Sequence, residues 1–446
     1  MSETKKLAVI LAAGKGTRMR SKLPKVLHRM CGASMLELVL SSVNSAGFNH
    51  SLVVIPEANS KFLDNKNDYY DYVVQKEPLG TGHALLQAVK NQDDYDNLLV
   101  LSGDNPLIKP NTLEILEKYH VSELNVMTIL TTEVSSDSDF GRIIRDSNGN
   151  IKKIIEFSEN NNDLKCIKEG NSGIYCFQVK WLKEKIKKIS PSLTGEIFLT
   201  DLVEIAYKNN DKLGSLKVTD STETLGVNNR VQLSQATKIL QNRIQNEWLM
   251  AGVSIEDPAT VYIDINAKIG EDTIIKPNTH INGTTFIGEK CQIGPNTIIK
   301  NSLIGNSCKV VSSVVNDSTV EEHVLIGPYS NVRGESYICR EVHIGTSVEV
   351  NRTHLGEKSK ISHFAYVGDA EIGINVNIGA GTVTCNYDGE EKHKTLIRDN
   401  SFIGSGTMLI APVTIGRNAI TGAGAVVKED VEPNTTVVGV PAKVIK

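Results

Sequence analysis

Aromatic residues are scarce in this sequence, at 5% of its 446 residues. No run reaches the roughly 18 apolar residues that a membrane-spanning helix needs, so we expect no membrane segment. The apolar run at residues 5–13 leads into a glycine loop rather than into a cleavage site, which argues against a secretory signal. These two absences favour a cytoplasmic protein.

Patterned cysteines and a charge excess are also lacking. The cysteines number seven, an odd count, and no Cys-x-x-Cys occurs, which predicts reduced thiols rather than a disulfide frame or a zinc site. Lys and Arg (48) nearly balance Asp and Glu (52). A net charge of -4 gives no basic surface for nucleic acid or for an acidic membrane.

An aliphatic residue recurs every six positions through most of the second half. A six-residue period fits neither a helix nor a two-faced strand, but it fits a parallel β-helix in which each six residues form one flat side of a coil. We expect the repeated residues to stack inward and the glycine that often follows them to occupy a turn where a Cβ would be hindered. The three registers are Ile269, Ile275, Ile281, Ile287, Ile293 and Ile299; Ile326, Val332, Ile338, Ile344 and Val350; and Ile403, Leu409, Ile415, Thr421 and Val427.

The first half instead alternates apolar runs with helical patterns. Alternation of this kind predicts a parallel α/β sheet with Rossmann-like winding, in which ligands bind at the carboxyl ends of the strands. The expected strands are 7–11, 51–55, 98–101 and 126–131, and the expected helices are 35–46, 84–90 and 113–119.

A helical pattern at 232–249 connects the two halves. We therefore expect a first domain at 1–229, a connecting helix at 230–250 and a second domain at 251–446, with the β-helix beginning after Pro258. The six-residue period breaks between 382 and 400, where Asn386-Tyr387-Asp388-Gly389 predicts a turn in an inserted loop. Such insertions commonly carry a binding site.

The segment from Leu11 to Arg18 follows the first expected strand. Its small residues, free backbone N–H groups and two cations are what a triphosphate requires, although a purely structural turn is the alternative. The spacing matches neither a Walker loop nor a dinucleotide fingerprint. Asp104 also follows a buried strand, where it could bind Mg²⁺ or could simply stabilise a turn. Lys25 is a further cation nearby, although a lone lysine is more often a solvated surface residue.

Several motifs, taken together, are specific for one family. The sequence resembles, over nearly its whole length, the family of bacterial bifunctional N-acetylglucosamine-1-phosphate uridyltransferase / glucosamine-1-phosphate N-acetyltransferase enzymes. The hexapeptide half contributes to the resemblance, together with segments 11–19, 24–25, 79–84, 102–104, 171–173 and 226–230, and Gln75. The resemblance implies a left-handed β-helix, a homotrimer, and UTP, acetyl-CoA and Mg²⁺ as reactants or cofactor. The end product would be UDP-N-acetylglucosamine, a cell-wall precursor.

For the first half, the resemblance implies in-line attack of a sugar 1-phosphate on the α-phosphorus of UTP. Arg18 and Lys25 would be the catalytic cations, aided by Lys15. Asp104 and Asn228 would bind Mg²⁺. The residues implied for the nucleotide and sugar are Leu11, Ala12, Ala13, Gly14, Lys25, Gln75, Gly80, Thr81, Gly141, Glu156, Asn171 and Asn228. Where the family usually has Tyr, this sequence has Ser102, and we expect the backbone to make that contact.

For the second half, acetyl transfer to an amine needs a base and oxyanion donors. His363 is the candidate base because histidine titrates near neutral pH, and its neighbours in the repeat place it on the outside of a coil. Taken alone, a histidine on such a surface is more often only a surface residue. The resemblance implies that the acceptor site holds Arg333, Tyr366, Asn377, Asn386, Tyr387 and Lys392, and that the acetyl-CoA groove holds Ala380, Ser405 and Ala423.

Three departures from the family concern this second site. Asn351 stands where a Lys is usual, Gly334 where a Pro is usual, and near Gly439 an expected Arg is missing, with only Lys443 close by. Arg352 could replace the charge at 351, but strand alternation predicts that it faces the opposite way. Two alternatives therefore remain: a single-activity nucleotidyltransferase with a trimerising β-helix, and a non-catalytic solenoid scaffold.

Overall fold

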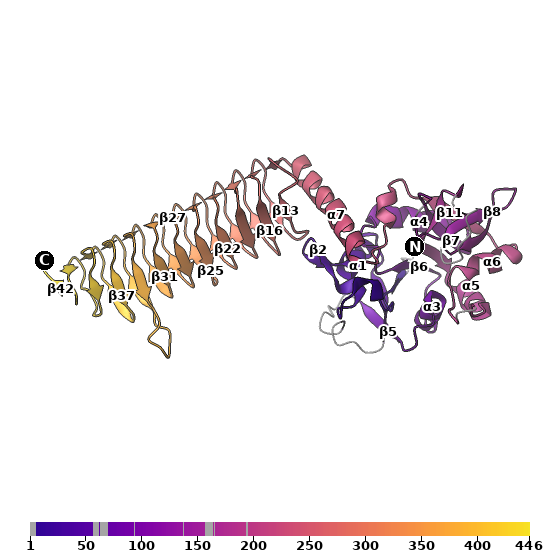
Figure 1. The fold of residues 1–446 in the computed structure, drawn as a ribbon, viewed down its shortest axis with the longest axis horizontal. Helices are drawn as coiled ribbons and strands as arrows, with labels where there is room; N and C mark the ends of the chain where they lie inside the picture. Colours follow the sequence, from indigo (N-terminus) through magenta and orange to yellow (C-terminus); the bar gives the residue numbers. More distant parts are fainter. Residues whose placement is uncertain are drawn as a thin grey trace. The chain divides into compact units, whose positions relative to one another are not determined.

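The computed structural model describes residues 6–56, 62, 70–92, 94–136, 138–156, 164, 166–192 and 195–446. The chain divides into two compact units, residues 1–239 and 240–446, and the division falls inside helix α7 (Arg230–Met250). The first unit contains the mixed α/β fold and the second contains the solenoid (Figure 1). In the part of the chain that is described, every helix is too short or too polar to cross a membrane.

The first unit is built on one sheet with strand order β11-β7-β10-β6-β1-β4-β5. The strands of this sheet are β1 (Leu7–Leu11), β4 (His50–Pro56), β5 (Asp71–Gln75), β6 (Asn97–Ser102), β7 (Met127–Glu133), β8 (Arg142–Arg145), β9 (Ile151–Ile155), β10 (Glu169–Gln178) and β11 (Leu213–Lys217), and a separate two-stranded sheet contains β2 (Arg29–Met30) and β3 (Ala33–Ser34). The helices of this unit are α1 (Met35–Ser45), α3 (Thr81–Val89), α4 (Pro110–Ser122), α5 (Val179–Lys185) and α6 (Asp201–Lys208), with 3-10 turns η1 (Thr17–Met19), η2 (Lys25–Leu27), η5 (Ile186–Lys188) and η6 (Ser221–Thr224).

The alternation of strands and helices expected for this half is confirmed. The expected parallel arrangement holds for β6, β1, β4 and β5 and for β11 with β7, and it fails at β10. Strand β10 runs antiparallel to both of its neighbours, β6 and β7. After β7 the chain forms the antiparallel hairpin β8–β9 rather than a helix. A parallel neighbour requires a long crossover connection, and the region between β7 and β10 supplies hairpin strands instead.

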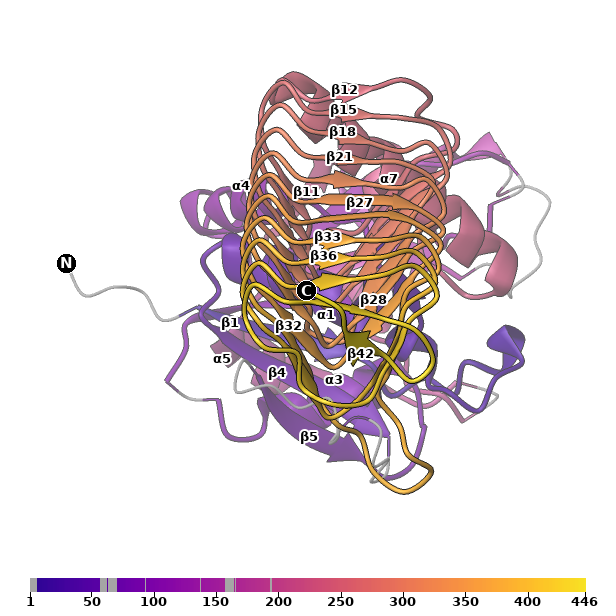
Figure 2. The same cartoon turned by 90° about the vertical axis from the view of Figure 1, so that its left-hand side faces the viewer.

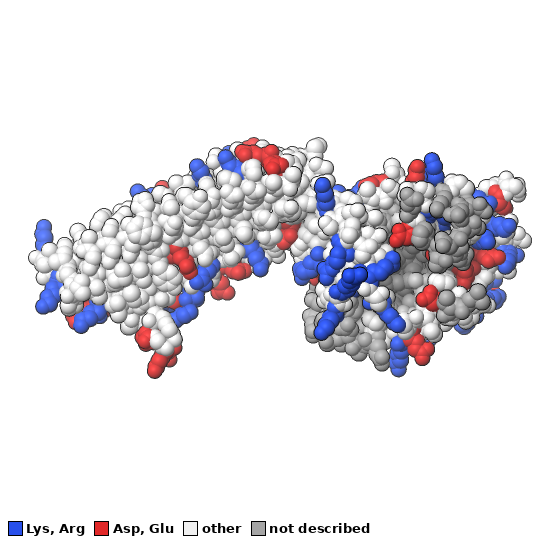
Figure 3. All heavy atoms as spheres, in the orientation of Figure 1, with Lys and Arg blue, Asp and Glu red and all other residues white. Residues whose placement is uncertain are grey.

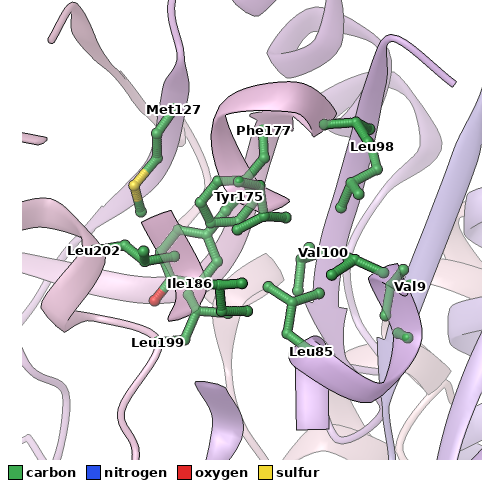
Figure 4. Close-up of a cluster of buried hydrophobic side chains, with 14 of the residues drawn as sticks. Val9, Leu85, Leu98, Val100, Met127, Tyr175, Phe177, Ile186, Leu199 and Leu202 are labelled. Carbon is green, nitrogen blue, oxygen red and sulfur yellow. The ribbon is translucent and has the colours of Figure 1, made fainter. Parts of the chain in front are cut away.

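The sheet is covered by helices that bury an apolar cluster against each face. Figure 4 shows one of these clusters, in which side chains from β1, β6, β7 and β10 meet those of α3 and α6. The labelled members are Val9, Leu85, Leu98, Val100, Met127, Tyr175, Phe177, Ile186, Leu199 and Leu202. This packing fixes the central strands, so the loops that leave their carboxyl ends start from rigid positions.

The second unit is a left-handed parallel β-helix whose coils stack three sheets (Figure 2). The 12-stranded sheet contains β12 (Ser254–Ile255), β15 (Ile274–Ile275), β18 (Gln292–Ile293), β21 (Lys309–Val310), β24 (Leu325–Ile326), β27 (His343–Thr346), β30 (Lys360–His363), β33 (Asn377–Ile378), β36 (Phe402–Ile403), β39 (Ile420–Thr421), β41 (Thr436–Val438) and β42 (Lys443–Val444). The 10-stranded sheet contains β13 (Tyr262–Ile263), β16 (Thr279–Asn282), β19 (Thr297–Lys300), β22 (Val314–Asn316), β25 (Asn331–Arg333), β28 (Glu349–Asn351), β31 (Tyr366–Gly368), β34 (Val383–Cys385), β37 (Met408–Ile410) and β40 (Val426–Val427). The 9-stranded sheet contains β14 (Lys268–Ile269), β17 (Phe286–Ile287), β20 (Leu303–Ile304), β23 (Thr319–Val320), β26 (Tyr337–Ile338), β29 (His354–Leu355), β32 (Ala370–Ile372), β35 (Thr395–Ile397) and β38 (Val413–Ile415).

The residues of the predicted six-residue registers are all buried, which confirms the inward stack. Coils approach so closely that a Cβ on Gly288 would overlap the Asn306 side chain and lie 2.8 Å from its backbone nitrogen. Glycine therefore follows the repeated aliphatic because the next coil leaves no room for a side chain.

The predicted start of the β-helix after Pro258 is wrong. Strand β12 precedes that proline and already pairs with β15, so the first coil begins earlier. In this coil the inward residues Ile255 and Ile263 are separated by a turn in which Thr260 N donates to Asp257 O. The turn lengthens the first side of the coil beyond six residues, and the sequence period therefore does not extend to it.

The expected inserted loop is present between β34 and β35 and projects from the solenoid (Figure 1). Tyr387 and Lys392 form an antiparallel bridge across it, and His393 N donates to Asn386 O at 2.8 Å. On the face shown in Figure 3, most of the β-helix surface is uncharged, and the Lys, Arg, Asp and Glu side chains lie near its upper and lower edges.

Candidate active sites

A cavity of about 510 Å³ lies at the carboxyl ends of β1, β5 and β6. Strand β1 lies between β4 and β6, both parallel to it, so the loops that follow these strands leave the same edge of the sheet. The lining residues are Leu11, Ala13, Gly14, Lys15, Gly16, Thr17, Arg18, Lys25, Gln75, Pro78, Gly80, Thr81, Ala84, Ser102, Asp104, Glu196 and Asn228. The structure thus collects most residues that the sequence assigned to the nucleotide, while Ala12 is buried and donates to Val54 O.

The glycine loop takes its shape from Gly16. Its φ of 59° lies in the left-handed region, and a Cβ there would lie 2.8 Å from Lys25 Cβ. The loop therefore lies directly against Lys25, with Arg18 in the next turn. The Arg18 side chain is 63% exposed and lies 4.0 Å from Asp139, so its guanidinium remains accessible to an anion in the cavity.

The Lys25 ammonium group contacts two other polar side chains of this cavity. Its Nζ contacts the carboxylate of Asp104 and donates to Asn228 Oδ1 at 3.0 Å. Two backbone bonds set this geometry: Gly103 N donates to Leu11 O at 2.9 Å, and Val227 N donates to Asp104 O at 2.9 Å. The Lys25 and Asp104 side chains are only 15% and 13% exposed, so this is not a solvated surface lysine.

The same oxygens can be tested against Mg²⁺. One carboxylate and one amide oxygen converge on a single cationic atom, Lys25 Nζ, inside a cavity of triphosphate size. Mg²⁺ prefers few protein oxygens and completes its shell with water and phosphate oxygens. Asp104 and Asn228 therefore fit a divalent cation that shares the cavity with a nucleotide.

Opposite the glycine loop, Gln75 is buried at the end of β5. Its Nε2 donates to Gly80 O at 3.1 Å and lies 3.0 Å from His83 Nδ1. Gly80 begins α3 with φ 99°, and Thr81 Oγ1 accepts from Leu199 N at 3.1 Å. The two contacts of Nε2 thus fix the orientation of the Gln75 side-chain amide, as hydrogen-bonding recognition of a base requires.

The three residues assigned to the sugar lie in a second cluster beyond that lining. Asn171 N donates to Gly141 O at 2.9 Å, and Asn171 Nδ2 donates to the Tyr175 hydroxyl at 2.7 Å. Glu156 Oε1 accepts from Thr200 Oγ1 at 2.9 Å. Thr200 follows Leu199, which is bonded to Thr81, so the cluster adjoins the nucleotide cavity along the chain. Burial raises the pKa of Tyr175, which stays a neutral hydroxyl.

In the second unit, the residues that the sequence assigned to the acceptor site, apart from Asn377, lie on the sheet that contains β25, β28, β31 and β34 or in the loop that follows β34. Tyr366 on β31 directs its hydroxyl to Asn386 Nδ2 at 3.4 Å, and the same Nδ2 contacts the Asp369 carboxylate. Arg333 on β25 donates to Glu349 through Nε at 3.0 Å and Nη2 at 2.6 Å. Lys392 lies near enough to lower the pKa of Asp369 electrostatically, after the larger effects of the Arg352 and Asn386 hydrogen bonds.

His363 and Asn377 lie on the neighbouring 12-stranded sheet. His363 ends β30, is exposed as predicted, and pairs with Thr346. Asn377 on β33 pairs with Lys360 at the other end of that strand. A corner at Phe364 and Ala365 separates His363 from Tyr366, so one chain presents these groups on two faces rather than in one compact pocket.

The three small residues assigned to acetyl-CoA form a column at one corner of successive coils. Gly406 N donates to Ala380 O at 2.7 Å, and Gly424 N donates to Ser405 O at 2.8 Å, which places Ala423 one coil beyond. No side chain in this column is longer than that of serine. A flat column of this kind suits an extended, slender ligand.

The expected orientation of Arg352 is wrong. Strand alternation ends with β28 at Asn351, and Arg352 follows it at a corner with φ 50°. Its guanidinium turns back, so that Nη1 donates to Asn351 Oδ1 at 3.1 Å while Nε and Nη2 donate to Asp369 at 2.6 and 2.8 Å. Sequence reasoning also missed Pro78 and Glu196, which line the first cavity without belonging to a recognisable phosphate motif.

Comparison with known families agrees with both halves. Residues 7–249 match the nucleotidyl transferase family, and residues 394–429 match the bacterial transferase hexapeptide family (six repeats). An α/β nucleotidyltransferase domain joined to a hexapeptide β-helix defines a two-domain transferase, and this chain is such an enzyme.

Three relatives named "Bifunctional protein GlmU" extend the comparison to nearly the full length. The protein from Geobacillus sp. is 43% identical over 96% of this chain and 94% of its own, and that from Caldanaerobacter subterraneus subsp. tengcongensis is 45% identical over 95% and 93%. The protein from Streptococcus equi subsp. zooepidemicus is 41% identical over 99% of this chain and 96% of its own. The chain belongs to the GlmU family of bifunctional proteins.

Proposed function

We propose that the chain catalyses two consecutive transfers. The β-helix unit moves an acetyl group from acetyl-CoA to the amine of glucosamine 1-phosphate. The first unit then moves a uridylyl group from UTP to N-acetylglucosamine 1-phosphate, releasing pyrophosphate. The observation that carries this proposal is the cavity in which Lys25, Asp104 and Asn228 converge beside the glycine loop.

In the uridylyl transfer, an oxygen of the sugar phosphate attacks the α-phosphorus of UTP in line and pyrophosphate leaves. No covalent intermediate is required, so catalysis consists of positioning and charge neutralisation. We assign Arg18, Lys15 and Lys25 to the phosphates and Gln75, Gly80 and Thr81 to the nucleoside. We assign Gly141, Glu156 and Asn171 to the sugar.

Mg²⁺ is part of this proposal, held by Asp104 and Asn228. When bound, it would neutralise charge on the phosphate oxygens. Lys25 contacts both proposed ligands, so this side chain keeps their oxygens together and places a positive charge beside the nucleotide. The low exposure of this group excludes most water, which strengthens each of these interactions.

In the acetyl transfer, His363 takes a proton from the amine as the amine nitrogen attacks the thioester carbonyl; the C–S bond then breaks and CoA leaves as the free thiol. Arg333, Tyr366, Asn377 and Lys392 hold the sugar phosphate. Asn386 and Tyr387 hold the acceptor from the inserted loop, while the column of Ala380, Ser405 and Ala423 accommodates the pantetheine arm. Because one chain presents His363 and Tyr366 on different faces, we propose a homotrimer in which coils of neighbouring subunits complete each site. The mass measured by light scattering tests this proposal, and the mass of a monomer would contradict it.

Two variants separate the reactions. Asp104→Ala should reduce uridylyl transfer by about 100-fold or more while leaving acetyl transfer unchanged. His363→Ala should do the reverse, because a positioned base contributes about 100- to 10,000-fold. Pyrophosphate release measures the first reaction, and free thiol released from acetyl-CoA in the presence of glucosamine 1-phosphate measures the second.

The wild-type chain distinguishes the alternatives. Thiol release that depends on the amino sugar supports two activities. Formation of UDP-sugar without thiol release would leave a single-activity nucleotidyltransferase with a structural β-helix. Loss of both activities in either folded variant would contradict the assignment of two separate sites.

A further inference from the structure

Arg352 lies at a corner where several groups of the acetyl-transfer site meet. On one side it is bonded to Asp369, which in turn contacts Asn386, and Asn386 lies beside the Tyr366 hydroxyl. Arg352 is therefore separated from two proposed acceptor-site residues by a single carboxylate. Its side chain is 37% exposed, so the guanidinium is fixed by the fold and still reachable from solvent.

The Arg352 guanidinium has more N–H donors than the acceptors around it occupy. Arginine carries five N–H groups, and acceptors among the described residues occupy three of them: two on Asp369 and one on Asn351. Two donors remain on a planar group whose orientation is already set. A pair of free guanidinium donors matches two oxygens of a phosphate group.

The local charge also favours an anion. Arg333 and Glu349 form one ion pair along this face, Arg352 and Asp369 form another, and Lys392 lies close to Asp369. Among these five side chains, three are positive and two are negative, which leaves one positive charge without a paired carboxylate. That excess is the complement of a bound phosphate, whose charge the pairs alone would not balance.

Two sequence departures form one structural unit with Arg352. A Cβ on Gly334 would overlap Asn351 Oδ1 and lie 3.0 Å from Arg352 Cγ. Gly334 thus provides the space that the Asn351 side chain occupies, and Asn351, which is only 2% exposed, supplies the acceptor that orients Arg352. The absence of a Lys at 351 therefore coincides with a neighbouring cation held at the same corner.

We infer that Arg352 binds the phosphate of the amino-sugar substrate in the acetyl-transfer reaction, positioned by Asp369 and Asn351. This inference rests on the proposed acetyltransferase function. A phosphate of acetyl-CoA would offer the same chemistry, but Ala380, Ser405 and Ala423 lie at the corner that precedes β34, whereas Arg352 lies at the corner that follows β28. The sugar phosphate is therefore the ligand on this side of the face.

The test is the effect of Arg352→Ala on the two Michaelis constants, with thiol release as the assay. KM for glucosamine 1-phosphate should rise about 10- to 100-fold, the effect of losing a charge-assisted hydrogen-bonded pair. KM for acetyl-CoA and kcat should change less than about two-fold. Arg352→Lys keeps the charge but loses the planar pair of donors, so its KM should fall between those of the wild type and Arg352→Ala.

Arg340→Ala is the matched control. Arg340 also pairs with a carboxylate, Glu357 at 2.9 Å, and its side chain is exposed, but it follows β26 at another corner. This variant should leave both Michaelis constants unchanged. An unchanged kcat for acetyl transfer in the same samples reports that the β-helix is intact.

Three results with Arg352→Ala itself would overturn the inference: an unchanged KM for the sugar phosphate, an equal rise in KM for acetyl-CoA, or a fall in kcat with both KM values constant. The last two would indicate a cofactor contact or a structural role. An equal effect of Arg340→Ala would reduce the result to general electrostatics and overturn it too. A wild-type chain that releases no thiol would instead refute the proposed acetyl transfer itself, before any variant is compared.

Discussion

The substitution Gly80→Ala tests whether the first cavity requires a residue without a Cβ at the start of α3. The backbone of Gly80 has φ 99° and ψ 176°, a conformation that residues with a Cβ adopt at a cost of about 1–3 kcal/mol. A Cβ there would also lie 2.6 Å from Ile197 O and 2.9 Å from Ile197 N. Ile197 cannot move freely, because Gly82 N donates to its oxygen and its own N donates to Leu79 O, both at 2.8 Å.

The expected magnitude follows from these two costs. Overpacking against fixed backbone adds about 1–3 kcal/mol to the conformational cost, so Gly80→Ala should destabilise the first unit by about 2–6 kcal/mol. For a unit of this size, each kcal/mol lowers the thermal midpoint by about 2–4 °C, which predicts a drop of about 4–24 °C. Because Gly80 lines the cavity, uridylyl transfer should fall as well, whereas acetyl transfer should persist.

Gly149→Ala provides the control. Gly149 also has a left-handed φ, of 84°, but its Cβ would have open space within 4 Å. It should therefore show only the conformational cost of about 1–2 kcal/mol and keep uridylyl transfer. Calorimetry of both variants, with the first unit identified as the transition that removes uridylyl transfer, makes the comparison. Equal midpoints for the two variants would refute the argument that Ile197 limits the space at Gly80.

Two further predictions concern the same unit. His120 is 1% exposed, and burial lowers its pKa to about 4, so the unfolded chain binds a proton at this histidine at a higher pH than the folded chain does. The free energy of unfolding should therefore fall by about 3 kcal/mol as the pH drops from about 6.5 to 4. Urea unfolding of His120→Gln should show a flatter pH dependence than the wild type, and an identical pH dependence would contradict this prediction. Lys25→Ala removes the ammonium group that contacts both Asp104 and Asn228 and should lower kcat/KM for UTP by about 100-fold or more. Lys217→Ala, which breaks an exposed ion pair with Glu133, should leave kcat/KM unchanged. Similar losses of kcat/KM in both variants would contradict a special role for Lys25.

The sequence determined the architecture because periodicity is a local property. Inward stacking every six residues was readable in three registers between Ile269 and Val427. The period is interrupted between these registers and at the inserted loop, and it does not reach the first coil, where a turn lengthens one side. The alternating strands and helices of the first half were readable too. The antiparallel strand β10 was not, because the direction in which a strand enters a sheet depends on the connection that precedes it rather than on its own residues.

The candidate sites, too, were predictable from the sequence only in part. Residue types and motifs selected Lys25, Asp104 and Asn228, but their convergence depends on backbone bonds between segments about 90 to 120 residues apart, which no local pattern encodes. Arg352 shows the limit most clearly. Alternation predicted its direction from the strand alone, and the side chain turned back because the strand ends one residue earlier, at a left-handed corner whose neighbours Gly334 and Asp369 belong to other coils. A sequence fixes which groups a chain possesses and the period on which they repeat; the packing of one coil against the next decides where those groups point.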